Sequence, residues 1–185
     1  MIIAELKKKE NIVEYILYIR QLMDIMRANG MDMSKIDELL VSKFEVSEKE
    51  KLKIHNWYQN LIETMRNEGV TEHGDIKEIK DLIEMLNKIH HALLDDKDEY
   101  RHHELYNWAK PNIDEYKRLS KSQSDNEIEI CINAMHALLL LKLQGKNISE
   151  ETAQAMQTFG SLLANLADVY KKCTMDNGQW TINNL

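Results

Sequence analysis

The segment IEICINAMHALLLLKL, residues 128–143, decides the fold class of this sequence. Its apolar residues cover nearly the whole circumference of a helix, which is typical of a helix with neighbours on every side. The longest uninterrupted apolar run, Ala137 to Leu141, is too short to span a bilayer. We therefore predict that residues from about 125 to 144 form the central helix of an all-α bundle.

Outside this segment, the chain has the pattern of amphipathic helices. Apolar residues recur at helical spacing nearly from end to end, and the one proline and six glycines lie mostly where helices would end. The sequence predicts a single-domain bundle of about six or seven helices over residues 1–173, followed by a C-terminal tail over residues 174–185. The tail holds Trp180, which either belongs to a frayed terminus or docks on the bundle or on a partner.

Local signals place several helix boundaries. The first helix is expected to run from about Ala4 to Ala28, and Pro111 is expected to kink or break the helix that contains it. A Ser or Asp followed three residues later by Glu is typical of a helix start, because the two side chains can satisfy the first free backbone N–H groups. Helices are expected to start at four such patterns, which begin at Ser47, Asp75, Asp96 and Ser124.

Composition and charge exclude several classes of partner. The net charge is −7, and the one dense basic run, residues 7–9, is flanked by glutamates, so a nucleic-acid partner is not expected. Cys131 and Cys173 form no CxxC pair, and the start of the chain lacks the long apolar stretch of a signal peptide. The sequence predicts a cytoplasmic protein without a membrane or nucleic-acid partner.

A histidine cluster around a predicted helix hairpin is the first candidate site. His90 and His91 precede the turn by about as many residues as His102 and His103 follow it, and Glu99 lies nearby. Imidazoles and a carboxylate converging from two helices could hold Zn, Fe or Mn. Adjacent histidines point about 100° apart on a helix, so at most one of each pair can face the partner helix. The competing interpretation is a hydrogen-bonded core histidine, with no cofactor.

A polar stripe on the predicted central helix is the second candidate site. Glu129, Asn133 and His136 share one face of the helix expected to be most buried. Buried polar groups need partners, so these residues could line a small ligand pocket with His136 as proton acceptor or ligand. The alternative is a hydrogen-bond network that sets helix register, or the one face that this helix shows to water.

Three segments carry a family resemblance: IIAELKKKENIVEYILYIRQLMDIMRA, WYQNLIETMRNEGVTEHG and EIEICINAMHALLLLKLQGKNISEETAQAMQTFGSLLANLADVYKK. Together they resemble a family of uncharacterised Bacteroidetes proteins, the domain of unknown function numbered 4924, over roughly residues 1–172. The resemblance implies a compact, single-domain, all-helical bacterial protein. It implies no activity, ligand or catalytic residue.

Catalytic motifs are missing from the sequence: it has no GxGxxG, P-loop, GxSxG or HExxH pattern. The sequence therefore favours a non-enzymatic helical interaction or scaffold protein, with a homodimer or another protein as partner. The alternatives are a regulatory module that binds a small ligand at the polar stripe, and a metal-binding protein that uses the histidine cluster.

Overall fold

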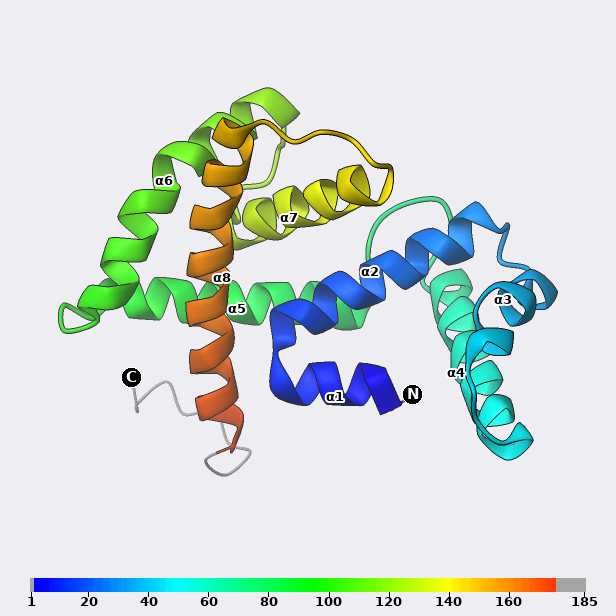
Figure 1. Cartoon of the computed structure of the whole chain (residues 1–185). Coiled ribbons are helices and arrows are strands. Elements are labelled where there is room, and N and C mark those ends of the chain that lie inside the picture. Colours follow the sequence, from blue (N-terminus) through cyan, green and yellow to red (C-terminus); the bar gives the residue numbers. More distant parts are fainter. Residues whose placement is uncertain (1, 176–185) are drawn as a thin grey trace.

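A computed structural model of the protein, which describes residues 2–175, is entirely helical apart from turns and loops (Figure 1). Its elements are α1 (Ile2–Glu10), α2 (Ile12–Ala28), α3 (Met33–Leu39), the 3-10 helix η1 (Val41–Lys43), α4 (Glu48–Asn67), α5 (Lys77–Asp95), α6 (Tyr100–Ser120), α7 (Glu127–Leu143) and α8 (Glu150–Met175). The predicted all-α, single-domain fold is confirmed. Trp180 lies outside the described residues.

The helices form two regions joined by α2. In the C-terminal four-helix region, α5, α6, α7 and α8 all pack against one another. The N-terminal region consists of α1, α3, η1 and α4, where α3 and η1 pack on α4. Helix α2 contacts α1 and α4 on one side and α5, α7 and α8 on the other. Figure 1 shows α3 and α4 at one end of α2, well separated from α6.

Helix α7 is central, as predicted, over its first half. It contacts α2, α5, α6 and α8, and five of its first eight residues are fully buried or nearly so: Ile128, Ile130, Cys131, Ile132 and Ala134. Its last turn is different, because Leu141 is 40% and Leu143 is 71% exposed. The apolar character of residues 128–143 therefore serves two purposes, core packing at one end and a solvent-exposed apolar surface at the other.

The predicted continuous helix over residues 4–28 is wrong. Asn11 separates α1 from α2, and its side-chain oxygen accepts hydrogen bonds from the backbone N–H groups of Val13 and Glu14. Asparagine is a strong N-cap residue because this bond satisfies N–H groups that have no partner inside the helix. The chain thereby starts a new helix at Ile12, and α1 folds back beside α2 (Figure 1).

Of the kink or break expected at Pro111, the break does not occur. Helix α6 runs through Pro111 without ending. Pro111 lacks the N–H that would bond to the carbonyl of Asn107, four residues earlier. Both residues are exposed, so water can satisfy that carbonyl.

Of the four expected helix starts, one has the expected cap. Ser47 and Glu50 form a complete capping box at the start of α4. Asp75 pairs with Arg20, and the first backbone N–H of α5, that of Lys77, donates instead to the side chain of Glu68. The residue before α6 makes no side-chain cap bond. At α7 the capping side chain is that of Asn126, which accepts from the N–H of Glu129.

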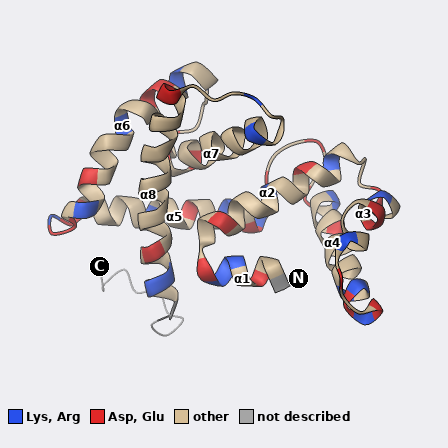
Figure 2. Cartoon of the chain, viewed as in Figure 1, with Lys and Arg blue, Asp and Glu red and all other residues tan. Residues whose placement is uncertain are grey.

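Acidic and basic residues are interspersed along the helices rather than gathered on one face in the view of Figure 2. In that view the basic residues do not gather on one helix or at one end of the molecule. Within the described part of the chain, no helix combines the length and apolar character that crossing a bilayer requires.

Candidate functional site

Two buried histidines join α5 to α6. The Nδ1 atom of His90 lies 2.8 Å from the Nε2 atom of His102, and neither side chain is exposed to solvent. Their neighbours point elsewhere: His91 is exposed, and the His103 ring bonds to the backbone carbonyl of Asp96. One histidine of each pair therefore contacts the partner helix, within the limit of at most one that helix geometry sets.

The histidine pair is the middle of a longer polar chain. His102 Nδ1 lies 2.8 Å from the side-chain oxygen of Asn165 on α8. On the other side, His90 Nε2 lies 3.7 Å from a carboxylate oxygen of Glu127 on α7, and it makes no hydrogen bond of normal length within the described residues. We call Asn165, His102, His90 and Glu127 the histidine junction, because each residue comes from a different helix of the four-helix region.

Burial and charge give the junction unusual protonation properties. Burial, which penalises the charged ring, lowers the pKa of His102 to about 4. The polar contact with His90 is the main cause that lowers the pKa of Glu127 to about 2, and Tyr106 and Lys110 add to it. Lys110 Nζ lies 3.5 Å from the Glu127 carboxylate. The junction therefore favours a neutral His102 at one end and an ionised Glu127 at the other.

Aromatic and thiol groups enclose the junction. The Tyr106 ring meets the His90 ring edge to face, with centroids 5.0 Å apart. Cys131 is fully buried on α7, and burial, followed by the charge of Glu127, raises the pKa of its thiol. Burial also raises the pKa of the Tyr106 hydroxyl. No nucleophile is activated here, because a raised pKa leaves both groups protonated at neutral pH.

The predicted metal ligands do not gather around one point. Two nitrogen ligands of a tetrahedral zinc ion, each about 2.0–2.1 Å from the metal, would lie roughly 3.3 Å apart. His90 and His102 are hydrogen-bonded at 2.8 Å instead, and His103 bonds to a backbone carbonyl. Glu99 lies at the start of α6. Within residues 2–175, no group of three or more His, Cys, Asp or Glu side chains is placed to hold a metal ion.

The predicted polar stripe of α7 mainly faces α2. Asn133 accepts a 2.8 Å hydrogen bond from Arg20, and His136 Nε2 lies 2.8 Å from a carboxylate oxygen of Asp24. Glu129 accepts from the Ser124 hydroxyl at 2.5 Å, and it also lines a cavity of about 290 Å³. Asn133 and His136 therefore act as contacts that set the register of α7 against α2.

Arg20 is the residue of this network that sequence reasoning missed. It is only 8% exposed, and its guanidinium makes a two-pronged pair with Asp75, at 3.0 Å from Nε and 2.5 Å from Nη2. This geometry is the strong form of an arginine–carboxylate pair. The available signal was its position on the apolar stripe of α2, four residues after Ile16 and three before Met23, where a cation must be paired.

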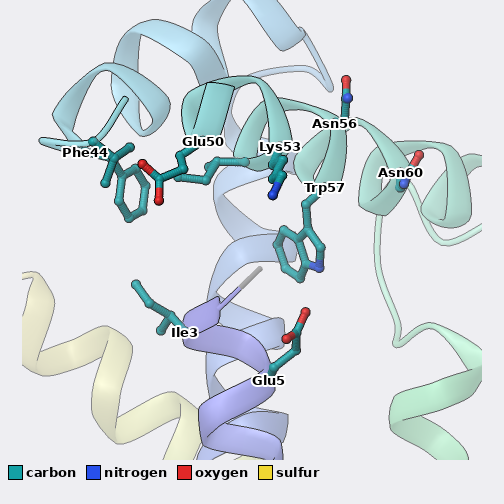
Figure 3. A pocket seen from close by; sticks show the side chains of 10 residues that line it. Ile3, Glu5, Phe44, Glu50, Lys53, Asn56, Trp57 and Asn60 are labelled. Atoms are coloured by element: carbon teal, nitrogen blue, oxygen red, sulfur yellow. The ribbon is translucent and has the colours of Figure 1, made fainter. Parts of the chain in front are cut away.

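An apolar groove lies between α1 and α4, in the N-terminal region (Figure 3). It has a volume of about 670 Å³. Its apolar lining residues are Ile3, Phe44, Val46, Ile54 and Trp57, and its polar ones are Glu5, Glu50, Lys53, Asn56 and Asn60. Figure 3 shows the Trp57 ring extending from α4 toward α1. We call this cavity the α1–α4 groove.

A second groove lies on the other side of Phe44. Its volume is about 610 Å³, and α2, α3, η1 and the last turns of α7 line it. Leu39 and Leu143, both largely exposed, lie along it. Because Phe44 lines both grooves, the apolar surface continues from one to the other.

Comparison with known families identifies the chain. Residues 1–177 match the model of a family described as a domain of unknown function, DUF4924. The chain belongs to the DUF4924 family. Neither a curated protein nor a solved structure matches it.

The DUF4924 match covers every described helix, so the histidine junction, the Arg20 network and the α1–α4 groove all lie inside the family region. Asn165 and Glu127 were not predicted to join the histidines, because they approach only when α7 and α8 pack on the α5–α6 hairpin. The groove was missed for a similar reason: Trp57 and Ile3 look like core residues on separate amphipathic helices until the structure shows the space between them.

Proposed function

We propose that this DUF4924 member is a non-enzymatic, self-associating interaction protein, in which the α1–α4 groove receives the same face of a second copy. The observation that carries the proposal is the distribution of exposed large apolar side chains. Among the described residues, most lie in the N-terminal region or at the adjoining end of α7: Ile3, Leu6, Leu39, Val46, Leu52, Leu141 and Leu143. Contiguous exposed apolar surface on a monomer is typical of an interaction site.

The four-helix region offers a contrast. Its remaining exposed large apolar side chains, Tyr100, Trp108 and Leu119, are all on α6, eight and eleven residues apart in sequence. Scattered exposed apolar residues are ordinary on a soluble surface and need no partner. The binding surface is therefore assigned to the α1–α4 groove and its rim.

A second copy fits this surface because the surface contains both a ridge and a groove. Ile3 and Leu6 are three residues apart on α1, so they lie on one face of that helix and form a ridge at the edge of the groove. A twofold axis would place the ridge of each copy against the groove of the other, which is the self-complementary arrangement that closed dimers require. A small ligand would fill the groove but would leave Leu6 and Leu52 exposed.

The buried polar chemistry supports a non-enzymatic assignment. The rings of His90 and His102 are fully buried and directed at each other, so no substrate can reach them without unfolding of the region. Catalytic groups must instead come within hydrogen-bond reach of a substrate. The cytoplasmic location and bacterial origin expected from the sequence stay predictions.

The test is the mass of the intact chain in solution as a function of concentration, measured by sedimentation equilibrium. We expect a monomer–dimer equilibrium for the wild type, and an Ile3→Asp variant that dissociates at least about tenfold more readily, since burying one uncompensated carboxylate costs more than ~1.4 kcal/mol. The matched control is Leu119→Asp on α6, which replaces a 64% exposed leucine and should leave the equilibrium unchanged.

A strictly monomeric wild type at all concentrations would overturn the proposal. Equal weakening by Ile3→Asp and Leu119→Asp would also overturn it, because the effect would then come from added negative charge rather than from the groove. A monomer whose melting temperature rises with a small apolar compound would assign the groove to a ligand instead.

A further inference from the structure

The histidine junction has a fixed direction of hydrogen bonding. His102 Nδ1 faces the side-chain oxygen of Asn165, which can only accept, so Nδ1 carries a proton. A neutral His102 then presents an unprotonated Nε2 to its partner ring. His90 Nδ1 must therefore carry the proton that the two rings share across 2.8 Å.

The outer nitrogen of His90 faces a carboxylate rather than another ring. If His90 were neutral, its bare Nε2 would face the carboxylate of Glu127 across 3.7 Å, and two acceptors would oppose each other. The side chain of Glu127 is 22% exposed, whereas that of His90 is fully buried. Nε2 is also a buried nitrogen without a hydrogen bond among the described residues, so the position is otherwise unsatisfied.

The two ring nitrogens that face each other, His90 Nδ1 and His102 Nε2, cannot both carry a proton while the bond between them persists. If both did, two N–H groups would point at each other across 2.8 Å. Two donors at that distance repel, and both rings are fully buried, so water cannot enter to separate them.

We propose that the histidine junction is an acid-sensitive latch between α5 and α6, which holds while only one of the two facing ring nitrogens carries a proton and breaks when both do. Breaking the His90–His102 bond removes the buried polar link within the α5–α6 hairpin and leaves Asn165 on α8 without its ring partner. The device therefore couples acidification to loosening of the four-helix region.

The charged and titratable groups around the two rings oppose a second proton on His102. Those nearest the two rings are His91 on α5, His103, Tyr106 and Lys110 on α6, and Glu127 and Cys131 on α7, while α8 contributes the uncharged Asn165. The carboxylate in this set lies beside His90. Next to His102 are two other histidines, and their charge opposes its protonation.

The direction of the pH effect follows from the lowered pKa of His102. Its folded-state pKa of about 4 lies below the ordinary value of 6.5. Between these two values the unfolded chain binds a proton that the folded chain does not, so stability falls as the pH is lowered through that window. From this group alone, the equilibrium constant for unfolding should be about 30-fold larger at pH 5 than at pH 8.

Urea unfolding of the full chain at pH 8 and pH 5 tests the latch. The comparison is between the wild type, His102→Gln, and the control His103→Gln, whose ring is half-buried and bonds only to the backbone carbonyl of Asp96. We expect the pH-dependent change in the unfolding constant to be about 30-fold smaller in His102→Gln than in the wild type. His103→Gln should keep most of the wild-type change. Equal pH dependence of wild type and His102→Gln would overturn the proposal.

A second measurement keeps the proposal testable if His102→Gln does not fold. Nitrogen-15 NMR of the imidazole rings in the folded wild-type chain reports which ring nitrogens carry protons between pH 8 and pH 5. We expect His102 to stay neutral, protonated on Nδ1, for as long as the fold persists. A His102 ring that gains its second proton near pH 6.5 while the protein stays folded would show that there is no latch.

Discussion

The C-terminal four-helix region and the N-terminal region differ in which side chains they bury and which they expose. In the four-helix region, even polar rings such as His90 and His102 are fully buried and are hydrogen-bonded to each other. In the N-terminal region, apolar side chains such as Leu6 and Leu52 remain in contact with solvent beside a groove of about 670 Å³. The two regions therefore differ in how much apolar surface they leave exposed, and this difference is the basis of the proposed self-association.

Helix α2 shows how the two regions are held together. Its Arg20 and Asp24 bond to Asn133 and His136 of α7, while other residues of the same helix pack on α4. A buried Arg20 paired to Asp75 is directional, so it sets the orientation of α2 more narrowly than apolar packing does. The N-terminal region is therefore carried on a helix whose own position is determined by polar contacts.

The largest expected effect compares one aromatic residue from each region. Phe159 on α8 is fully buried and packs edge to face on Tyr116, whereas Trp57 on α4 is half-buried and borders the groove. Phe159→Ala should lower the free energy of unfolding by about 3–5 kcal/mol, and Trp57→Ala by about half as much, since an open site leaves less of a cavity. Urea unfolding measures both. Equal losses would mean that the groove is packed as tightly as the core.

A medium effect concerns the charge of Glu127. Because its folded pKa is lowered to about 2 from the ordinary 4.5, the ionised carboxylate stabilises the protein above about pH 4.5, and this contribution is lost as the pH falls toward 2. Glu127→Gln should therefore lower the free energy of unfolding by about 2 kcal/mol at pH 7. The difference from the wild type should shrink at pH 3. A difference that is the same at both pH values would assign the loss to packing instead.

The smallest expected effect tests whether the N-terminal region opens on its own. Ser47 caps α4, and Ser149 makes the equivalent bond to the backbone N–H of Thr152 at the start of α8. Replacing either serine by alanine should cost about 1 kcal/mol. Amide hydrogen exchange then separates the regions: Ser47→Ala should speed exchange in α4 about fivefold without changing α8. Faster exchange in both helices would show one cooperative unit.

Much of this architecture could be predicted from local sequence. The all-round apolar pattern of residues 128–143 predicted a central helix, and the structure confirms it for the first half. The Ser47 capping box was also predicted, because all of its bonds lie within four residues. The Asn11 break was missed, since the apolar stripe continues through it and conceals the cap. Periodicity alone does not distinguish one long helix from two helices with compatible faces.

Of the candidate sites, only the contacts between residues close together in the sequence could be predicted. His90 and His102 were expected at one level because a tight hairpin joins them, and they do meet. Their outer partners, Asn165 and Glu127, come from helices later in the chain, and no spacing in the sequence relates them. The groove depends on the distance between α1 and α4, which is set by how each packs on α2.

The buried thiol of Cys131 can be used as a chemical probe for opening of the four-helix region. It lies in the second turn of α7, with no exposed surface, and its raised pKa keeps it unreactive while the region is closed. A thiol reagent can modify it only while α7 is separated from its neighbours, so each modification records one opening event. The labelling rate of Cys131 would thus measure how often the four-helix region opens, separately from any change at the α1–α4 groove.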